Sequence, residues 1–573
     1  MSSSISTEKL SEPRGVLRRS GAVGGSALLA GGAVGSALLM SLFASPAGAV
    51  TTFTVDTNAD GVANASDCVT PVANSCSLRD ALAAATTDGD VIVFDAALSG
   101  QIISLSQGQL SVDAGITITG LGSANLTVDA GGNSRVFYIS TTPSGVEVAI
   151  SGLSIINGDA QGDYGGGIYD LHNGDLTLKD VSITGCDAKY GGGVYVEYSD
   201  GTVEIVDSTI SDNYAMASGG ALYTDGGGDL VITNSIFDGN AAGVNGGAGN
   251  IGNYGKVTIV GSTFSNNYAG SAGGAFYILS VVTGDVSISG SSFIDNTATD
   301  GGGAIYTKNA GSFTVTSSTF SGNTTGSGSL GGALNLATTG QVVTVTDSLF
   351  ADNYAGYGGA LNSGGPDQIV TINNSTFVGN SSLYGGAAIF KDQGGSLTIN
   401  MSTITENSAA SGGGVWSYSG QGDEPDVTIT GTILTGNTGT GGAADDLNVY
   451  DQYDAVATIS NSILGVVDAD ITVTASNNID ATAPGFVLGL GALADNGGAT
   501  ETMALLAGSP AIDAGPATVP TFVGNGFDQR GTPFVRVYNG QSDIGAFESQ
   551  PDPTPTTTTT VASDETVVPA FTG

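Results

Sequence analysis

The sequence predicts an all-β protein: a right-handed parallel β-helix, or solenoid, with a short N-terminal capping helix. First, one aliphatic or aromatic residue recurs at gaps of 27 to 30 residues, a period typical of stacked repeats. Second, runs that alternate apolar and polar residues precede these positions, and no helical pattern of ten or more residues separates them. One turn of chain per repeat, paired with its neighbours, gives the β-helix. The recurring positions are Ile155, Ile183, Ile210, Phe237, Phe264, Phe293, Phe320, Phe350, Phe377, Ile404, Leu434 and Leu464.

An Asn residue follows three positions after most of these apolar residues. We expect the apolar side chains to stack inside the solenoid and the Asn side chains to share amide hydrogen bonds along a turn. Gly-Gly pairs nearby allow positive φ angles and close approach between turns. Cys186 takes the Asn position in an early repeat, where a buried thiol is expected. The expected structural ladder includes Phe264, Phe293, Phe320, Asn213, Asn240, Asn267, Asn353 and Asn380.

Phrases such as TFSNNYAGSAGGAF (263–276) and TISDNYAMASGGAL (209–222) combine FxxN-like and GGA motifs. They resemble the repeats of the chlamydial polymorphic outer-membrane proteins, a family of surface adhesins. The resemblance covers about 150–440. It implies a parallel β-helix at a cell surface, and it makes adhesion a hypothesis for this chain. We assign the β-helix repeats to 101–480.

Residues 1–49 have the pattern of an export signal. Arg18 and Arg19 precede a small and apolar stretch (22–43), and Ala47-Gly48-Ala49 offers a small-x-small cleavage pattern. A signal anchor is the alternative. Because no other segment has eighteen consecutive apolar residues, we expect no transmembrane segment in the mature chain. The predicted location is extracellular or at the cell surface.

The chain is strongly acidic, with a formal net charge of −40 from 53 acidic and 13 basic residues. Without 1–49, 51 acidic and nine basic residues remain, so the charge is near −42. This balance excludes a nucleic-acid partner, because neutralising phosphates requires clustered Lys and Arg. Most of the carboxylates are expected to solvate the surface.

The segment 50–100 contains Cys76-Ser77-Leu78-Arg79-Asp80-Ala81. It resembles the module named after its CSLREA motif, with Asp80 in place of Glu. In such proteins the module opens an extracellular β-helix, which implies that SLRDALAAA forms the capping helix here. Ser77 and Asp80 have the spacing of a capping box. Cys68 and Cys76 are candidates for a short disulfide in an oxidising compartment.

Within this module, five oxygen-bearing side chains follow the spacing of a twelve-residue calcium loop around Gly61. Calcium takes six to eight oxygen ligands, which such alternation can supply. Calcium is therefore the one cofactor considered, and an ordinary turn between two strands is the alternative. The candidate ligands are Asp56, Asn58, Asp60, Asn64 and Asp67.

The segment 485–548 contains GSPAIDAG (508–515), DQRG (528–531) and DIGAFE (543–548). It resembles the choice-of-anchor module at the C-terminus of bacterial surface β-helix proteins. Arg530, with Asp528 and Asp543 nearby in sequence, is expected to make a structural ion pair. The remaining residues, 549–573, form a tail rich in Pro and Thr.

Catalytic constellations are weak in this sequence. The mature chain has one histidine, and its basic residues are scattered. The nearest candidate patch comprises Asp170, His172, Asp175, Lys179 and Lys189, for which a solvated turn is the simpler interpretation. The adjacent pair Asp445-Asp446 would point to opposite faces of a strand.

Aromatic residues suggest a second kind of site. They could form a sugar-stacking stripe, although tyrosines beside a double glycine commonly pack a turn. A third idea, ice or crystal binding by Thr-x-Thr strands such as 428–430, is disfavoured because the pairs look irregular. The aromatic residues are Tyr164, Tyr190, Tyr195, Tyr214, Tyr254, Tyr268, Tyr354, Tyr357, Tyr384, Trp416 and Tyr418.

The sequence therefore favours a secreted or cell-surface structural and binding protein, adhesin-like and without catalytic activity. Its expected partners are glycans or the surface of a host or neighbouring cell. The alternative is an extracellular polysaccharide-acting β-helix enzyme, a lyase or a glycosidase, because this fold also hosts such enzymes.

Overall fold

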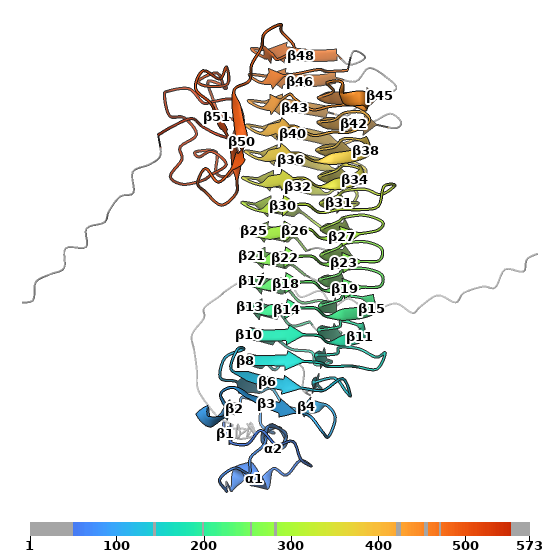
Figure 1. Cartoon of the computed structure of the whole chain (residues 1–573), viewed down its shortest axis with the longest axis vertical. Coiled ribbons are helices and arrows are strands. Elements are labelled where there is room, and N and C mark those ends of the chain that lie inside the picture. The colour runs from blue at the N-terminus through green and yellow to red at the C-terminus, as the bar shows by residue number, and fades with distance from the viewer. Residues whose placement is uncertain are drawn as a thin grey trace, which may run out of the picture. The chain divides into compact units, whose positions relative to one another are not determined.

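The computed structural model describes residues 50–551, except 71, 141–144, 198–199, 253–254, 280–283, 420–425, 452–455 and 469–471. The predicted export signal lies outside the described residues, as does 552–573 of the predicted tail. The described part of the chain is a stack of solenoid turns. The strands of each turn pair in parallel and in register with their equivalents one repeat later (Figure 1). The predicted parallel β-helix is confirmed.

One large sheet contributes two strands to most turns of the helix, and the long strands β8 and β10 span both positions. Its strands are β1 (Thr52–Val55), β2 (Val91–Phe94), β3 (Gln101–Ser104), β5 (Thr117–Thr119), β6 (Leu126–Asp129), β8 (Val148–Ile156), β10 (Leu176–Thr184), β13 (Val203–Val206), β14 (Thr209–Ser211), β17 (Leu230–Thr233), β18 (Ile236–Asp238), β21 (Val257–Val260), β22 (Thr263–Ser265), β25 (Val286–Ser289), β26 (Ser292–Ile294), β29 (Phe313–Thr316), β30 (Thr319–Ser321), β32 (Val342–Thr346), β33 (Leu349–Ala351), β36 (Ile369–Asn373), β37 (Thr376–Val378), β40 (Ser396–Asn400), β41 (Thr403–Thr405), β43 (Asp426–Thr430), β44 (Ile433–Leu434), β46 (Val456–Ser460), β47 (Ile463–Leu464), β48 (Thr472–Ser476) and β49 (Ile479–Asp480).

A second sheet has 13 strands, one per turn. They are β4 (Leu110–Val112), β7 (Phe137–Ile139), β9 (Ile168–Asp170), β12 (Val194–Glu197), β16 (Leu222–Asp225), β20 (Gly249–Gly252), β24 (Phe276–Leu279), β28 (Ile305–Lys308), β31 (Leu334–Leu336), β35 (Leu361–Ser363), β39 (Ile389–Lys391), β42 (Val415–Ser419) and β45 (Leu447–Asp451). A third, short side holds β11 (Asp187–Tyr190), β15 (Tyr214–Ser218), β19 (Ala241–Ala242), β23 (Tyr268–Ala269) and β27 (Thr297–Ala298), then β34 (Tyr354–Tyr357) and β38 (Ser381–Gly385).

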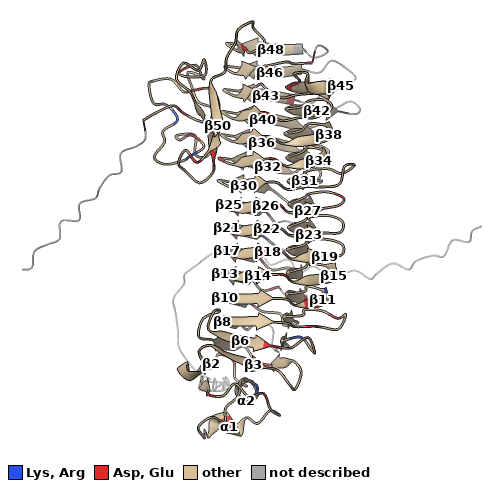
Figure 2. Cartoon of the chain, in the orientation of Figure 1, with Lys and Arg blue, Asp and Glu red and all other residues tan. Residues whose placement is uncertain are grey.

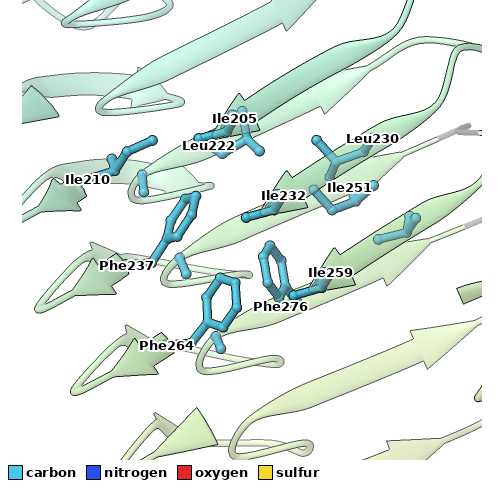
Figure 3. Packing of buried hydrophobic residues seen from close by; sticks show 14 of the residues in the cluster. Ile205, Ile210, Leu222, Leu230, Ile232, Phe237, Ile251, Ile259, Phe264 and Phe276 are labelled. Atoms are coloured by element: carbon cyan, nitrogen blue, oxygen red, sulfur yellow. The ribbon is translucent and has the colours of Figure 1, made fainter. Parts of the chain in front are cut away.

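The interior is filled by side chains that repeat from turn to turn. Phe264, Phe293 and Phe320 are fully buried, and their ring centroids are 4.8 and 4.7 Å apart. Figure 3 shows Phe237, Phe264 and Phe276 packed together with isoleucines and leucines of neighbouring strands. Stacking of equivalent apolar residues is what the recurring positions predict, because in-register parallel strands place identical side chains one above another.

The recurring Asn residues form a buried hydrogen-bonded ladder. The Nδ2 of Asn267 donates to Oδ1 of Asn296 at 2.9 Å and to the carbonyl of Phe237 at 2.9 Å. Asn213, Asn240, Asn353 and Asn380 make the equivalent bonds.

The two ends of this ladder use other residues. At the first rung, the backbone N–H of Cys186 donates to Oδ1 of Asn213. At the last rung, Asn437 donates to Oδ1 of Asp446 from both its backbone N–H and its Nδ2. Asp446 therefore terminates the ladder, which gives this member of the Asp445-Asp446 pair a structural role.

The first turn is covered by the N-terminal module. It contains α1 (Ser66–Val69) and α2 (Leu78–Ala84). The Ser77–Asp80 capping box is present at the start of α2, whose apolar face is buried against the core. Short 3₁₀ turns lie at Ala96–Leu98 and Thr440–Gly442.

The C-terminal module lies against the side of the β-helix rather than over its last turn (Figure 1). Its two strands, β50 (Leu490–Ala494) and β51 (Thr502–Leu505), are antiparallel. Met503 packs on Leu349, Ala351 and Val378, which lie on β33 and β37. The module is therefore part of the same compact unit as the solenoid.

Candidate functional site

A column of aromatic side chains runs along the outer face of the 13-stranded sheet. The second residue of each strand points outward, and its two neighbours in the strand point inward. The register therefore places one outward side chain per turn at this position. We call this set the aromatic column. Its aromatic members are Tyr138, Tyr169, Tyr195, Tyr223, Tyr277, Tyr306, Phe390 and Trp416, and Asn250, Asn335, Asn362 and Asn448 occupy intervening or terminal turns.

The N-terminal part of the aromatic column is widened by Tyr164 and Tyr190, which reach it from the preceding turn. Tyr164 stacks on Tyr195 with ring centroids 4.7 Å apart and meets Tyr169 edge-on. Tyr190 meets Tyr223 edge-on at 5.2 Å. Because the rings stand at different angles, this N-terminal cluster presents both ring edges and ring faces.

Charged groups border the N-terminal cluster. The guanidinium of Arg135 lies 5.0 Å from the ring centroid of Tyr169 and donates to the carbonyl of Tyr164 at 2.8 Å. The hydroxyl of Tyr169 donates to the carboxylate of Glu197. Burial and this hydrogen bond both raise the pKa of Tyr169, so its proton stays on the phenol near neutral pH.

A shallow cavity of about 200 Å³ adjoins the N-terminal cluster on the Arg135 side. Gln109, Ser134, Arg135, Gln161 and Asp163 line it. Arg135 is held there by Gln109 at 2.8 Å and by Asp163 at 3.3 Å. The site therefore combines an aromatic surface with a fixed cation and several amide and carboxylate oxygens.

A second cluster lies towards the C-terminal end of the same column. Trp416 meets Phe390 edge-on at 5.3 Å, and Tyr357 lies 5.1 Å from Phe390. Tyr384 lies 4.9 Å from Tyr357 and is 44% exposed. The two clusters are centred on the same 13-stranded sheet, several turns apart, and Tyr357 and Tyr384 reach the second cluster from β34 and β38.

Of the eight aromatic members of the column, the sequence indicated only Tyr195 and Trp416, and it did not predict their common face. The signal was the second residue of each strand in the 13-stranded sheet, which alternates with buried neighbours. Tyr214 and Tyr268 lie instead on β15 and β23, outside the aromatic column. Tyr254 lies outside the described residues.

The five candidate calcium ligands do not converge in the structure. Asp56 accepts the backbone N–H groups of Asn74 and Cys76, both at 2.9 Å. Asp60 pairs with Arg79 at 2.7 Å and also accepts two backbone N–H groups. Although burial opposes it, these bonds lower the pKa of Asp60.

The other three candidates have their own local partners. Asn58 donates to the carbonyl of Ile102, and Asn64 donates to Asp67 at 2.9 Å. Among the described residues, no group of three His, Cys, Asp or Glu side chains is arranged to hold a metal ion. Calcium binding by this loop stays a prediction.

Cys68 and Cys76 form a disulfide that ties α1 to the segment before α2. Cys186 is buried, and burial raises the pKa of its thiol to about 12. A thiol with that pKa is unreactive at neutral pH.

The predicted patch around His172 is not a surface site. Asp170 and His172 are both buried inside the β-helix, where Nδ1 of His172 contacts the carboxylate of Asp170. The other ring nitrogen lies 3.3 Å from the carbonyl of Asp175. Burial opposes protonation, but these oxygen partners raise the pKa of His172 overall. Lys179 is exposed on β10, and Lys189 lies over the ring of Tyr190.

Arg530 makes the expected structural pair with Asp528 at 2.6 Å. Its guanidinium lies between the rings of Phe534 and Phe547, 3.8 Å from each centroid. Asp543 instead accepts the backbone N–H groups of Asp513 and Ser549.

Comparison with known proteins identifies the same architecture. A family model described as a right-handed beta helix region matches residues 114–264 and 244–393. No curated protein matches the sequence. Among the described residues, no helix is long and apolar enough to cross a membrane.

Three solved structures are similar to this chain at low sequence identity. Tailspike protein 3 of bacteriophage CBA120 is 13% identical over 74% of this chain and 61% of its own, with a TM-score of 0.37. Pectate lyase Pel9A is 13% identical over 87% and 96%, with a TM-score of 0.27. A mannuronic acid specific polysaccharide family 6 lyase from human gut microbiota is 10% identical over 77% and 86%, with a TM-score of 0.24.

This chain thus spans less than two thirds of the tailspike's length. At these TM-scores the similarities carry no argument about this chain. Repeat pattern, strand register and family model agree that the chain is a right-handed parallel β-helix protein.

Proposed function

We propose that this chain is an exported protein of the extracellular space or cell surface that binds glycans, in an adhesin-like role without catalysis. The observation that carries the proposal is the aromatic column. Two clusters of rings lie on the outer side of the 13-stranded sheet; Tyr195 and Phe390 are buried within them, and Tyr384 is 44% exposed. Aromatic rings with a few fixed polar groups are the usual means by which proteins bind amphipathic ligands such as sugars.

The acidic surface supports the choice of partner. Figure 2 shows that acidic residues are spread over many turns of the β-helix, whereas basic residues are few. A polyanionic partner would be repelled by this charge, except near Arg135 and Lys189. A glycan whose contacts are mainly rings and hydroxyls avoids that repulsion.

The export part of the proposal rests on the sequence of 1–49 and on the disulfide. A disulfide between Cys68 and Cys76 persists in oxidising compartments and is rare in the cytosol.

One arrangement favours a second candidate, a polysaccharide-acting enzyme. Arg135, Tyr169 and Glu197 lie together on the exposed sheet face, and this combination of cation, phenol and carboxylate occurs in acid–base catalysis. The raised pKa of Tyr169 disfavours it as a base at neutral pH. Its bond to Glu197 also occupies the carboxylate that would have to act.

The test is binding of the purified full chain to a glycan array, followed by affinity measurements on the best ligands. Tyr164→Ala and Tyr384→Ala each remove a ring from one cluster, and we expect at least one of them to weaken binding about tenfold or more. Tyr214→Ala and Tyr268→Ala are matched controls, because these exposed rings lie outside the aromatic column. Equal affinities for all four variants would contradict the proposal.

The same ligands decide between binding and catalysis. Bound glycans are incubated with the chain and assayed for new reducing ends and for the ultraviolet absorbance of an unsaturated product. We expect neither to appear. Turnover that Glu197→Gln abolishes would establish the enzymatic alternative.

A further inference from the structure

A second regular array lies on the outer face of the large sheet. Nine strands that pair one after another in this sheet, from β21 to β48, place a hydroxyl side chain at the same register position. We call this set the hydroxyl column. Its members are Thr258, Ser287, Thr314, Thr344, Thr371, Thr398, Thr428, Thr458 and Thr474.

The Thr-x-Thr pairs are irregular, as expected, but the irregularity lies in one of their two positions. Only the second position of each pair varies: it is Val260 on β21, Asn373 on β36 and Ser460 on β46. In these nine strands the first position is always Thr or Ser, but gaps of 16 to 30 residues between them hide it in the linear sequence. Earlier turns carry Glu204 and Val231 there, so the position accepts other residues.

The nine hydroxyls are available to a ligand. All nine side chains are at least partly exposed, and within the described residues none of them is hydrogen-bonded to another protein group. The neighbouring column differs, because Asn400 donates to Asn373 at 2.9 Å and Thr430 lies 3.4 Å from Ser460. The hydroxyl column is thus a row of unpaired donors and acceptors at the rung spacing of about 4.8 Å.

The middle of this face is neutral and partly apolar. Val342 and Ile369, which lie two residues before Thr344 and Thr371, are 47% and 48% exposed. From β29 to β40 no charged residue occupies the hydroxyl column or the positions two residues to either side. In a chain with a net charge of −40, this strip offers hydroxyl groups and hydrocarbon without charge.

The C-terminal module restricts what can lie on this strip. Thr346, Asn373 and Asn400 are 6%, 2% and 8% exposed at the turns where the module packs. A flat crystal face such as ice would meet the module beside the hydroxyl column. A single extended chain can run along the column without that obstruction.

We propose that the hydroxyl column binds one extended chain of a neutral, linear polysaccharide that lies parallel to the axis of the β-helix. Such a chain has hydroxyls for the Thr side chains and C–H faces for Val342 and Ile369. One sugar unit of an extended chain is close in length to one rung. Nine rungs span about 38 Å, so about eight sugars fill the column. The glycan class rests on the proposed function, but the surface is separate from the aromatic column.

The experiment measures affinity of the full chain for uncharged β-1,4-linked glucose, mannose and N-acetylglucosamine oligomers of about four, eight and twelve sugars. We expect affinity to rise up to about eight sugars and then level off. The triple variant Thr314→Val, Thr344→Val, Thr371→Val removes three hydroxyls with little change in shape. It should weaken binding of the longer oligomers about tenfold or more.

A control triple variant separates hydroxyl loss from general damage. Thr209→Val, Thr263→Val and Thr319→Val alter half-buried threonines on β14, β22 and β30, away from the hydroxyl column, and should leave affinity unchanged. Equal affinity of the wild type and the first triple variant, or affinity that does not depend on length, overturns the proposal.

Tyr384→Ala separates this proposal from the function proposed above. Binding lost in Tyr384→Ala but kept in the triple variant overturns the hydroxyl column and leaves the aromatic column standing. Inhibition of ice recrystallisation that the triple variant abolishes, without oligomer binding, would show ice to be the occupant and would also overturn it.

Discussion

At the scale of single residues, the buried Phe and Asn ladders stack identical side chains from one turn to the next. Phe264 lies between Phe237 and Phe293, with ring centroids 5.0 and 4.8 Å away. The energetic consequence is that one substitution disturbs contacts with two identical neighbours. Coupling in a solenoid runs mainly between adjacent turns, so the damage should stay local.

Phe264→Ala tests this. Removing a fully buried ring from a stacked position should cost about 3–5 kcal/mol, because the two flanking rings hold the cavity open. Denaturant unfolding of the full chain, followed by circular dichroism, measures the loss. Tyr268→Ala, four residues later and exposed, is the control and should be nearly neutral. A loss below about 1 kcal/mol for Phe264→Ala would mean that the stack relaxes around the gap.

At the scale of elements, the sequence predicts the strands but not the common faces on which the aromatic and hydroxyl columns lie. Alternation within 256–264 identifies inward and outward residues, and the recurring Phe and Asn identify equivalent turns. The common faces of the aromatic and hydroxyl columns depend on register between strands whose equivalent residues are 16 to 32 positions apart. Variable turn lengths conceal that register, so those columns required the structure.

In the N-terminal loop, the spacing in the sequence predicts a calcium site, whereas the structure gives the candidate ligands separate protein partners. Asp56 and Asp60 have the spacing of calcium ligands, yet each carboxylate accepts other protein donors. Arg79, read in the sequence only as part of a motif, supplies the charge opposite Asp60. Spacing cannot reveal such a partner nineteen residues away.

Asp60→Ala tests the importance of that ion pair. It leaves Arg79, which is largely buried, without its partner, and should destabilise the N-terminal module by about 2–3 kcal/mol. The lowered pKa of Asp60 means that its contribution is present above its ordinary value of 3.8 and is lost on acidification below it. Hydrogen exchange of 50–110 in the full chain, at pH 7 and pH 3, measures both effects. Exchange unchanged by the substitution would contradict them.

Calcium and chelator can be compared in the same experiment. Because the candidate ligands are bonded separately, we expect no added protection of 56–67 in calcium. Protection that appears in calcium and disappears with chelator would show that the loop rearranges to bind the ion.

At the scale of the whole molecule, a buried polar relay links the C-terminal module to the β-helix. Arg536 of the module is buried and donates to the Asn374 side chain, whose Nδ2 donates to Asp347. Burial raises the pKa of Asp347 to about 7, although Asn374 and Arg536 oppose the shift. Burial likewise raises the pKa of Glu548 in the module to about 7.

These raised pKa values predict that docking of the module depends on pH. Asp347 and Glu548 titrate near 7 when docked and near 4 when exposed, so the docked state binds more protons between these values. Docking should therefore weaken as pH rises from about 4 to about 7, by about 2–4 kcal/mol after solvent screening, and stay constant above. Proteolysis of 490–550 across this range measures it. Asp347→Asn keeps the acceptor for Asn374 and should remove a large part of the pH dependence of docking. Cleavage independent of pH in the wild type would contradict the prediction and would show that both carboxyls stay neutral or find water in each state.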